Sequence, residues 1–306
     1  MKKLFFILPV ISGIFWGSSG IFVRTLTEAG MNSFTILTCR MAVAVVILFL
    51  IILFFDRSLL KIHLKDIWLF AAGGLLGTLG LNLCYNEAVN RLTLSLAAVL
   101  LSLAPVFVLL FAAIFFKEKI TGKKVGCMLL AIFGCALVSG IFENASGLTW
   151  SASGIIIGAS SAFFYALYSI FSKLAMERGY HPLTVTFYCL LLITAVLLPL
   201  TDWSAVAGFV TQSFAKHTGF LLLHSLCAYI MPYILYTVSL SHIEAGKASI
   251  LASGEPVAAM IFGLIFYSEI PTVLSVCGLA LTIAALTLLS MPDKKSLPKP
   301  KKTEKI

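Results

Sequence analysis

The sequence predicts an all-α integral membrane protein whose ten transmembrane helices form two inverted five-helix repeats. Three observations lead to this fold class: the composition, an internal repeat and the placement of the basic residues. Of 306 residues, 60% are hydrophobic and 11% are charged, whereas soluble domains contain about 45–50% and about 25%. No water-soluble core of this size could bury so much apolar surface, so the bilayer must be the solvent.

Ten apolar runs are each long enough to cross a hydrocarbon core of about 30 Å. We expect helices, because a lipid-exposed backbone must satisfy its own hydrogen bonds and the runs are too long for barrel strands. The first run is expected to be an uncleaved helix rather than a secretory signal. The predicted helices are Leu4–Val23, Phe34–Phe55, Ile67–Asn86, Leu94–Phe116, Val125–Phe142, Ser153–Ser172, Leu183–Leu200, Thr218–Val238, Ala248–Tyr267 and Val273–Met291.

A similar segment occurs near the end of each half of the sequence. Residues 102–121 and 253–272 lie 151 positions apart and share eight of their twenty residues. Each copy has a proline inside the apolar run and a glutamate at its end. Matches at an offset of 149, such as Ile21-Phe22 with Ile170-Phe171, extend the repeat to the start of each half. A duplicated membrane unit of this kind is typical of secondary transporters.

The basic residues are distributed unequally between the two sides of the predicted bundle. With the N-terminus inside, eighteen Lys and Arg residues fall in inner segments and three in outer ones, namely Arg24, Arg91 and Lys216. Because cytoplasmic segments are enriched in Lys and Arg, both termini are expected in the cytoplasm. The net charge of +9 therefore reflects topology, and no nucleic-acid partner is expected.

Each half holds five predicted helices, an odd number, so the second half should enter the membrane from the opposite side. We expect a first repeat over residues 4–142, a second over 153–291 and a basic cytoplasmic tail over 292–306. Inverted repeats allow one central site to be reached alternately from either face. The tail is expected to act as a solvated anchor, with contact to anionic lipid as the alternative.

Two runs of the sequence resemble the EamA domain of the drug/metabolite transporter superfamily. CYNEAVNRLTLSLAAVLLSLAPVFVLLFAAIFFKEKIT (84–121) has an aromatic segment, a small-residue stretch, a Pro-Val and a terminal Glu, and YTVSLSHIEAGKASILASGEPVAAMIFGLIFYSEIPT (236–272) repeats the pattern. The segment GIFWGSSGIFVR (13–24) and Arg40 are similar to the opening of the same domain. The resemblance implies a ten-helix transporter with a central cavity that exports or exchanges small metabolites.

Other functional classes lack their motifs. The sequence contains no GxxxxGK[ST], HExxH or GxSxG motif, and its seven cysteines form no metal-spaced cluster. We therefore expect no nucleotide motor, no catalytic residues, no metal and no cofactor. A passive channel is the alternative function, and an intramembrane enzyme is a weaker one.

Two charged residues lie inside predicted helices, where an unpaired charge costs several kcal/mol. Glu255 is about eight residues into its helix and is the leading candidate for proton coupling or for binding an amine; a structural hydrogen bond is the alternative. Arg40 could bind an anionic group or pair with Glu255, but snorkelling or a structural pair is the favoured interpretation. His224 is expected to be a hydrogen-bonded structural residue, with a proton relay as the alternative.

Further candidates come from helical spacing. Pro105 and Pro256 each free a backbone carbonyl near the midplane, and Ser102 and Ser253 can help to satisfy the freed groups. The interruptions indicate either a binding region or a kink needed for packing. Polar and aromatic stripes from both halves would line a mixed cavity. Its candidate residues are Trp16, Ser19, Asn82, Tyr85, Tyr165, Tyr168 and Tyr233. Anchoring at the membrane interface is the alternative role for the tyrosines.

The glutamates Glu118 and Glu269 end the two copies of the repeated segment and are expected to serve gating or structure. The sequence as a whole predicts a transporter of the cell membrane that exports or exchanges small metabolites, such as amino acids, by alternating access. Its expected partners are a small-molecule substrate, the lipid bilayer and coupled protons. Neither the substrate nor the oligomeric state follows from the sequence.

Overall fold

Helices are the only regular elements in the described part of the computed structural model, which covers residues 4–92, 94–138, 141–142, 151–268 and 270–291. The first half contains α1 (Leu4–Gly17), α2 (Ser19–Glu28), α3 (Ser33–Phe55), two 3₁₀ turns η1 (Arg57–Leu60) and η2 (Leu64–Asp66), α4 (Ile67–Ala71), the π-helical η3 (Ala72–Leu79), α5 (Gly80–Arg91), α6 (Leu94–Leu101), α7 (Ala104–Phe116) and α8 (Gly122–Val138).

The second half follows the same order. It contains α9 (Ala152–Glu177), α10 (Pro182–Leu197), the 3₁₀ turn η5 (Leu198–Leu200), α11 (Trp203–Gln212), α12 (Phe214–Ser225), the π-helical η6 (Leu226–Ile230), α13 (Met231–Leu240), α14 (Ala245–Ala252), α15 (Glu255–Tyr267) and α16 (Val273–Ser290). One helix is unexpected, because α11 occupies a segment with no predicted span. It is short, and Asp202 caps its N-terminus by accepting from the backbone of Ser204 and Ala205.

Nine helical stretches among the described residues are long and apolar enough to cross a membrane. The one predicted span not among these nine, Val125–Phe142, corresponds to α8, of which 17 residues are described. Large apolar side chains face outward along the spans, with Phe55 86% and Ile114 71% exposed. Lipid is the environment that such a surface requires, so the chain is a multi-pass membrane protein.

Equivalent backbone irregularities recur in both halves. The left-handed residues Lys117 and Ser268 both have φ 54°, and each ends a helix of 13 residues. Gly30 and Gly179 also share positive φ values, 87° and 91°. The π-helical segments η3 and η6 occupy matching parts of the repeat. The two halves thus share backbone detail that residue identity alone does not reveal.

Helices α3 and α10 pack against each other and are joined at both ends by equivalent threonines. The backbone N–H of Asp202, just beyond α10, donates to Thr35 at the start of α3 (3.0 Å). The hydroxyl of Thr184, at the start of α10, donates to the carbonyl of Leu59, just beyond α3 (2.8 Å). Since the start of each helix meets the end of the other, the two helices run antiparallel.

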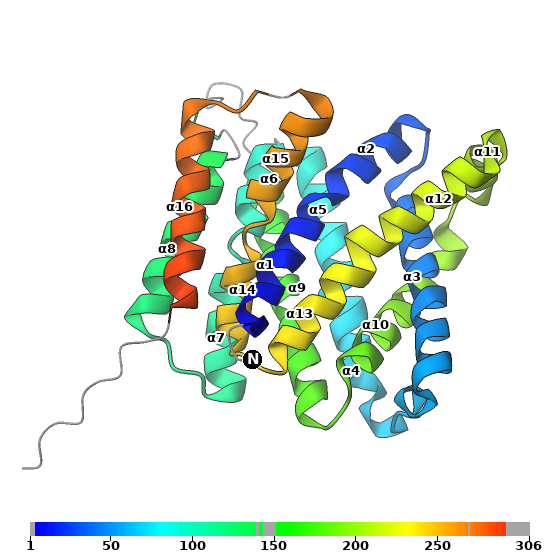
Figure 1. The fold of residues 1–306 in the computed structure, drawn as a ribbon, viewed down its shortest axis with the longest axis horizontal. Coiled ribbons are helices and arrows are strands. Elements are labelled where there is room, and N and C mark those ends of the chain that lie inside the picture. Colours follow the sequence, from blue (N-terminus) through cyan, green and yellow to red (C-terminus); the bar gives the residue numbers. More distant parts are fainter. Residues whose placement is uncertain (1–3, 93, 139–140, 143–150, 269, 292–306) are drawn as a thin grey trace, which may run out of the picture.

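Helices α8 and α16 lie side by side at one edge of the bundle (Figure 1), and α1 crosses its centre. Gly134 on α8 and Gly278 on α16 allow their backbones to touch, which is how small residues let membrane helices approach closely.

We expect Gly134→Ala to destabilise the protein by about 1–3 kcal/mol, because the added Cβ would lie 2.9 Å from the carbonyl oxygen of Gly278. Gly126→Ala is the matched control on the same helix, since a Cβ there meets no atom within 4 Å. Thermal unfolding of the purified variants in detergent measures the effect. Equal melting temperatures for the two variants would contradict the expected tight contact.

Candidate functional site

Aromatic side chains from both halves meet inside the bundle. Trp16 of α1 packs against three tyrosines of the second half, with ring centroids 6.0 Å from Tyr165, 5.4 Å from Tyr233 and 5.5 Å from Tyr236. Tyr168 joins the cluster through Tyr233 at 5.1 Å. Trp16 and Tyr165 are partly exposed, whereas the other three are buried. The structure therefore brings together the predicted residues Trp16, Tyr165, Tyr168 and Tyr233.

The buried tyrosines of this aromatic cluster are held by hydroxyl contacts. The hydroxyl of Tyr168 lies 2.8 Å from that of Thr237, and the hydroxyl of Tyr236 lies 2.8 Å from that of Ser169. Buried phenols need such partners, because an unmade hydrogen bond in this environment is costly. These contacts connect α9 with α13 and fix the wall against which Trp16 packs.

Arg40 on α3 is buried and surrounded by neutral groups. Its Nη1 donates to the hydroxyl of Ser19 (3.2 Å) and its Nη2 to the side-chain oxygen of Asn82 (2.9 Å). The guanidinium carbon lies 4.4 Å from the centre of the Tyr229 ring, a cation–π arrangement. Arg40, Ser19 and Asn82, predicted from separate helices, thus form one cluster.

Glu255 is the first residue of α15 and is partly exposed. It interacts electrostatically with Tyr85 on α5, with Tyr165 on α9 and with Cys135 on α8. No ion pair or hydrogen bond involves its carboxylate among the described residues, and the contemplated pair with Arg40 is not formed. The predicted residue Tyr85 therefore lies on the Glu255 side of the site.

The helices carrying the repeated segment are broken at both prolines. One run divides between α6 and α7 and the other between α14 and α15, so Pro105 and Pro256 each fall in the first turn of a new helix. Pro is tolerated there because that N–H has no partner in the helix. Both predicted interruptions are therefore present as breaks between two helices.

Cys135 of α8 lies between the two breaks. Its thiol donates to the carbonyl of Ser253 (3.3 Å) and has a hydrogen bond with the Ser102 side chain. The Ser253 hydroxyl in turn donates to the carbonyl of Ile250 (2.6 Å). The Ser253 hydroxyl thus satisfies a carbonyl one turn before the second break, and Ser102 contacts the Cys135 thiol.

Helix α1 lies directly on the second break. A Cβ at Gly13 would stand 2.5 Å from the carbonyl oxygen of Ala252, and one at Gly17 would stand 2.7 Å from that of Glu255. Both positions must be glycine for this approach. The GxxxG pair of α1 thus places Trp16 beside the start of α15.

Glu118 sits where four segments meet at one end of the bundle. Its carboxylate is 7% exposed and accepts from Nζ of Lys173 on α9 (2.7 Å), while Lys124 on α8 lies 3.8 Å away. It also accepts from the backbone N–H of Ala245 (2.8 Å) and Gly246 (3.4 Å), the first residues of α14. We call Glu118, Lys124, Lys173 and the start of α14 the Glu118 cluster. The equivalent glutamate of the second half, Glu269, lies outside the described residues.

Lys124 extends the Glu118 cluster to Glu244, the N-cap residue of α14, at 2.9 Å. Burial raises the pKa of the Glu244 carboxyl, but the hydrogen bond and charge of Lys124 and the charge of Lys247 outweigh it and hold the pKa below its usual value near 4.5. A carboxyl whose pKa is lowered by folding stabilises the protein above the unfolded pKa. That contribution is lost as the pH falls through the folded pKa.

We therefore expect the melting temperature of the native protein to fall below about pH 4.5, and to fall less in Glu244→Gln, which lacks the contribution at every pH. The effect should be modest, because the Glu244 side chain is 40% exposed. Melting temperatures measured from neutral to acidic pH test this. Glu177→Gln, a change at an exposed position, is the control. Parallel acid sensitivity in all three proteins would contradict the expected contribution.

Several polar residues at these sites escape sequence reasoning. Neither Lys173 nor Lys124 was among the residues predicted for the site or the gate. Lys173 stands 149 residues after Arg24, so the two basic residues occupy equivalent positions of the repeat, and this match is a signal for Lys173 in the sequence. The expectation of a hydrogen-bonded His224 is wrong, since neither ring nitrogen has a partner among the described residues. Its ring instead stacks on Phe22 at 5.0 Å.

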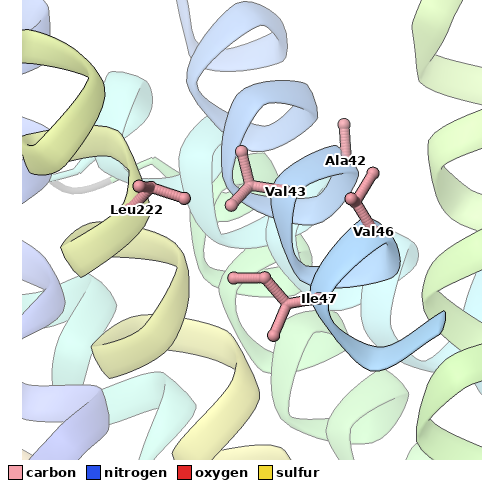
Figure 2. Close-up of a pocket in the computed structure, with 5 residues that line it drawn as sticks. All are labelled: Ala42, Val43, Val46, Ile47 and Leu222. Carbon is pink, nitrogen blue, oxygen red and sulfur yellow. The ribbon is translucent and has the colours of Figure 1, made fainter. Parts of the chain in front are cut away.

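A separate hollow on the surface of α3 and α12 is entirely aliphatic. Figure 2 shows its lining by Ala42, Val43, Val46, Ile47 and Leu222. Its volume is about 250 Å³. Without a polar side chain it has no means of recognising a polar molecule, so the polar and aromatic clusters described above are the better candidate.

Similarity to a protein family and to known proteins extends over most of the chain. The profile of the EamA-like transporter family matches twice, over residues 3–140 and 152–291. The pseudopaline exporter CntI of Pseudomonas aeruginosa (strain UCBPP-PA14) is 28% identical over 221 residues, which covers 72% of this chain and 74% of the relative. A probable terminal-alkyne amino-acid exporter of Streptantibioticus cattleyicolor is 25% identical over 226 residues, 74% of each chain.

Two further comparisons extend over nearly the whole chain. An uncharacterized transporter of Archaeoglobus fulgidus is 25% identical over 291 residues, covering 94% of this chain and 99% of the relative. A solved crystal structure superimposes with a TM-score of 0.73, covering 94% of this chain and 96% of the other at 15% identity. This last similarity shows a shared fold alone.

Proposed function

Because the chain belongs to the EamA-like transporter family, a family of transporters and not of enzymes, we propose that it exports or exchanges a small, partly polar metabolite such as an amino acid. The mechanism is alternating access, driven by a gradient rather than by a nucleotide. The names of two relatives, an exporter of pseudopaline and a probable exporter of a terminal-alkyne amino acid, support the direction and the chemical class.

The observation that carries this proposal is the meeting of both halves at the aromatic cluster. Trp16 comes from the first half, and its partners Tyr165, Tyr233 and Tyr236 come from the second. A site built from both halves changes its access when one half moves against the other. Polar groups at its edges, Arg40 and Glu255, supply charges of opposite sign that a substrate with an amine and an acid could use.

The architecture we propose is ten helices in two inverted halves, residues 4–142 and 153–291, with the basic tail 292–306 and both termini in the cytoplasm. Two features support inversion: the basic residues of the sequence, and the antiparallel pair α3 and α10 joined by Thr35 and Thr184. The repeated backbone irregularities support the duplication itself. Equivalent residues at opposite ends of a helix pair are what an in-plane two-fold axis produces.

The Glu118 cluster acts as a gate at the cytoplasmic end. It joins α7 of the first half to α9 and α14 of the second through Lys173 and the backbone of Ala245. Because it ties the halves together beyond the aromatic cluster, it must open for substrate to pass on that side. Glu269 is assigned the matching role at the outer end, from its place in the repeat.

Counter-flow in proteoliposomes tests the function. Metabolites released in excess by cells that overproduce the protein, compared with cells that lack it, supply the candidate substrates. A transporter exchanges labelled for unlabelled substrate with saturable kinetics. Conduction that neither saturates nor shows counter-flow would indicate a channel, and chemical conversion of the compound would indicate an enzyme.

A further inference from the structure

We infer that the molecule carried by this protein bears a carboxylate, and that Arg40 binds this group through the edge of its guanidinium that has no protein partner. The inference rests on the proposed transport function and specifies one chemical group of its substrate. It is carried by the contacts of Arg40 rather than by the identity of any relative.

The charge of Arg40 is not balanced within the described protein. The residue is 7% exposed, and no acidic side chain lies within ion-pair distance of it among the described residues. Its neighbours are a hydroxyl, an amide oxygen and an aromatic ring. A buried charge without a counter-ion costs several kcal/mol. A carboxylate brought by the substrate would remove that cost.

The guanidinium also has hydrogen-bonding capacity to spare. Of its five N–H donors, Ser19 and Asn82 use one each, the Tyr229 hydroxyl has a hydrogen bond with the same side chain, and the buried Nε has no partner among the described residues. A carboxylate binds best to two neighbouring donors of one guanidinium at once, a geometry that Lys cannot offer. Nε and one Nη of Arg40 provide such a pair.

A second unpartnered donor lies near Arg40. His224 is fully buried, is within electrostatic range of Arg40, and has no hydrogen-bond partner for either ring nitrogen among the described residues. The Arg40 Nε–H lacks an acceptor, and so does the N–H of the His224 imidazole. A neutral imidazole also carries one accepting nitrogen, so a carboxylate would satisfy the donor of each residue and leave that nitrogen unpaired.

The surrounding residues hold Arg40 in position, and two of them are partly exposed. The Ser225 hydroxyl donates to the Arg40 carbonyl (2.6 Å), and the amide of Asn82 is fixed by donating to the carbonyl of Thr78 (2.7 Å). Ser19 and Asn82 are themselves partly exposed. The guanidinium therefore lies one side chain behind an accessible surface, and its fixed orientation lowers the entropic cost of binding.

Matched pairs of ligands test the inference. Amino acids and hydroxy acids are titrated one at a time, each beside its own carboxamide, onto the full-length protein in lipid nanodiscs, with affinity taken from the thermal-shift titration. The amide keeps the size and shape of the acid and removes the charge. For any acid that binds, we expect its amide to bind at least about tenfold more weakly.

Substitutions at Arg40 test whether this residue causes the preference for the acid over its amide. Arg40→Gln should make acid and amide bind equally, and Arg40→Lys, which keeps the charge, should retain part of the preference. Arg57→Gln is the control: it makes the same change at an exposed position just beyond the other end of α3 and should bind as the native protein does. If Arg40→Gln fails to fold, the acid–amide comparison on the native protein still shows whether a carboxylate is preferred, and Arg40→Lys still tests the role of Arg40.

Three results would overturn the inference: equal affinity for acid and amide, an acid preference that persists in Arg40→Gln, or a panel in which no acid binds. The proposed function fails in a different way. Binding of an acid without counter-flow would contradict transport but leave the carboxylate site standing. Counter-flow of amides as fast as of acids would support transport and remove the carboxylate site.

Discussion

Glu118→Ala should unfold at a markedly lower temperature than the native protein, with a loss of about 3–5 kcal/mol in the free energy of unfolding. The change removes the carboxylate that accepts from Lys173, which is 14% exposed, and that lies 3.8 Å from the buried ammonium of Lys124. It also leaves two backbone N–H groups at the start of α14 without a partner. Thermal unfolding in detergent, monitored by circular dichroism, measures the loss.

The isosteric variant separates charge from hydrogen bonding. Glu118→Gln keeps an oxygen that can accept from the N–H of Ala245 but loses the charge that neutralises Lys173. Its melting temperature should therefore lie between those of the native protein and Glu118→Ala. Glu177→Ala, at an exposed position of α9, should melt as the native protein does. A native melting temperature for Glu118→Ala would show that the cluster contributes nothing to stability.

The surroundings of Glu118, at the end of α7, show which features the sequence predicts and which it does not. The repeat predicted that Glu118 and Glu269 end equivalent helices, and the prolines predicted both helix breaks, because both features depend only on the identity of the residues. The partners of Glu118 are spread over α8, α9 and α14, from Lys124 to Ala245. Their proximity depends on packing between the halves, which no local pattern encodes.

Backbone hydrogen-bond register was also beyond prediction. The π-helical segments η3 and η6 are hydrogen-bonded between residues i and i+5 instead of i and i+4, yet their side chains are as apolar as those of an ordinary span. Gly77 in η3 approaches the backbone of Tyr168, where a Cβ would lie 2.7 Å from the Tyr168 nitrogen. The irregular turn and this close approach to α9 occur together. Only the three-dimensional contact reveals why the helix is wound differently there.

Residue type and spacing predicted the candidate site, but they did not predict that its residues form two separate groups. Charge inside a predicted helix marked Arg40 and Glu255, and helical spacing marked the tyrosines, so all of them were assigned to one site. The structure separates them: Arg40 contacts Tyr229 and Asn82, while Glu255 interacts with Tyr85 and Tyr165. Periodicity fixes a face of a helix, whereas which faces meet depends on helix crossings that are set by contacts such as Gly13 against Ala252.

Glu255→Gln should lower the rate of counter-flow at least about tenfold and abolish its pH dependence, while the melting temperature stays close to the native value. No ion pair or hydrogen bond to the carboxylate is lost among the described residues, so folding should not suffer. Gln fills the same space and removes a membrane-buried charge. The functional loss follows if the missing partner of the carboxylate is the substrate amine or the coupled proton. Proteoliposome counter-flow across a range of pH measures both quantities.

The Glu118 variants are tested by their melting temperatures, whereas the Glu255 variants are tested by transport rate and pH dependence. Each combination of rate and pH dependence assigns Glu255 a different role. A slower rate with an intact pH dependence would mean that Glu255 binds the substrate amine without titrating. An unchanged rate and an unchanged pH dependence would exclude both roles. Glu255→Asp, which keeps the charge on a shorter stem, should retain the pH dependence. The copies of the repeat differ here, since Ala104 begins α7 where Glu255 begins α15. The two halves have similar backbones, so a difference in side chains, such as Glu255 against Ala104, is needed for the shared site to bind one chemical group on one side only.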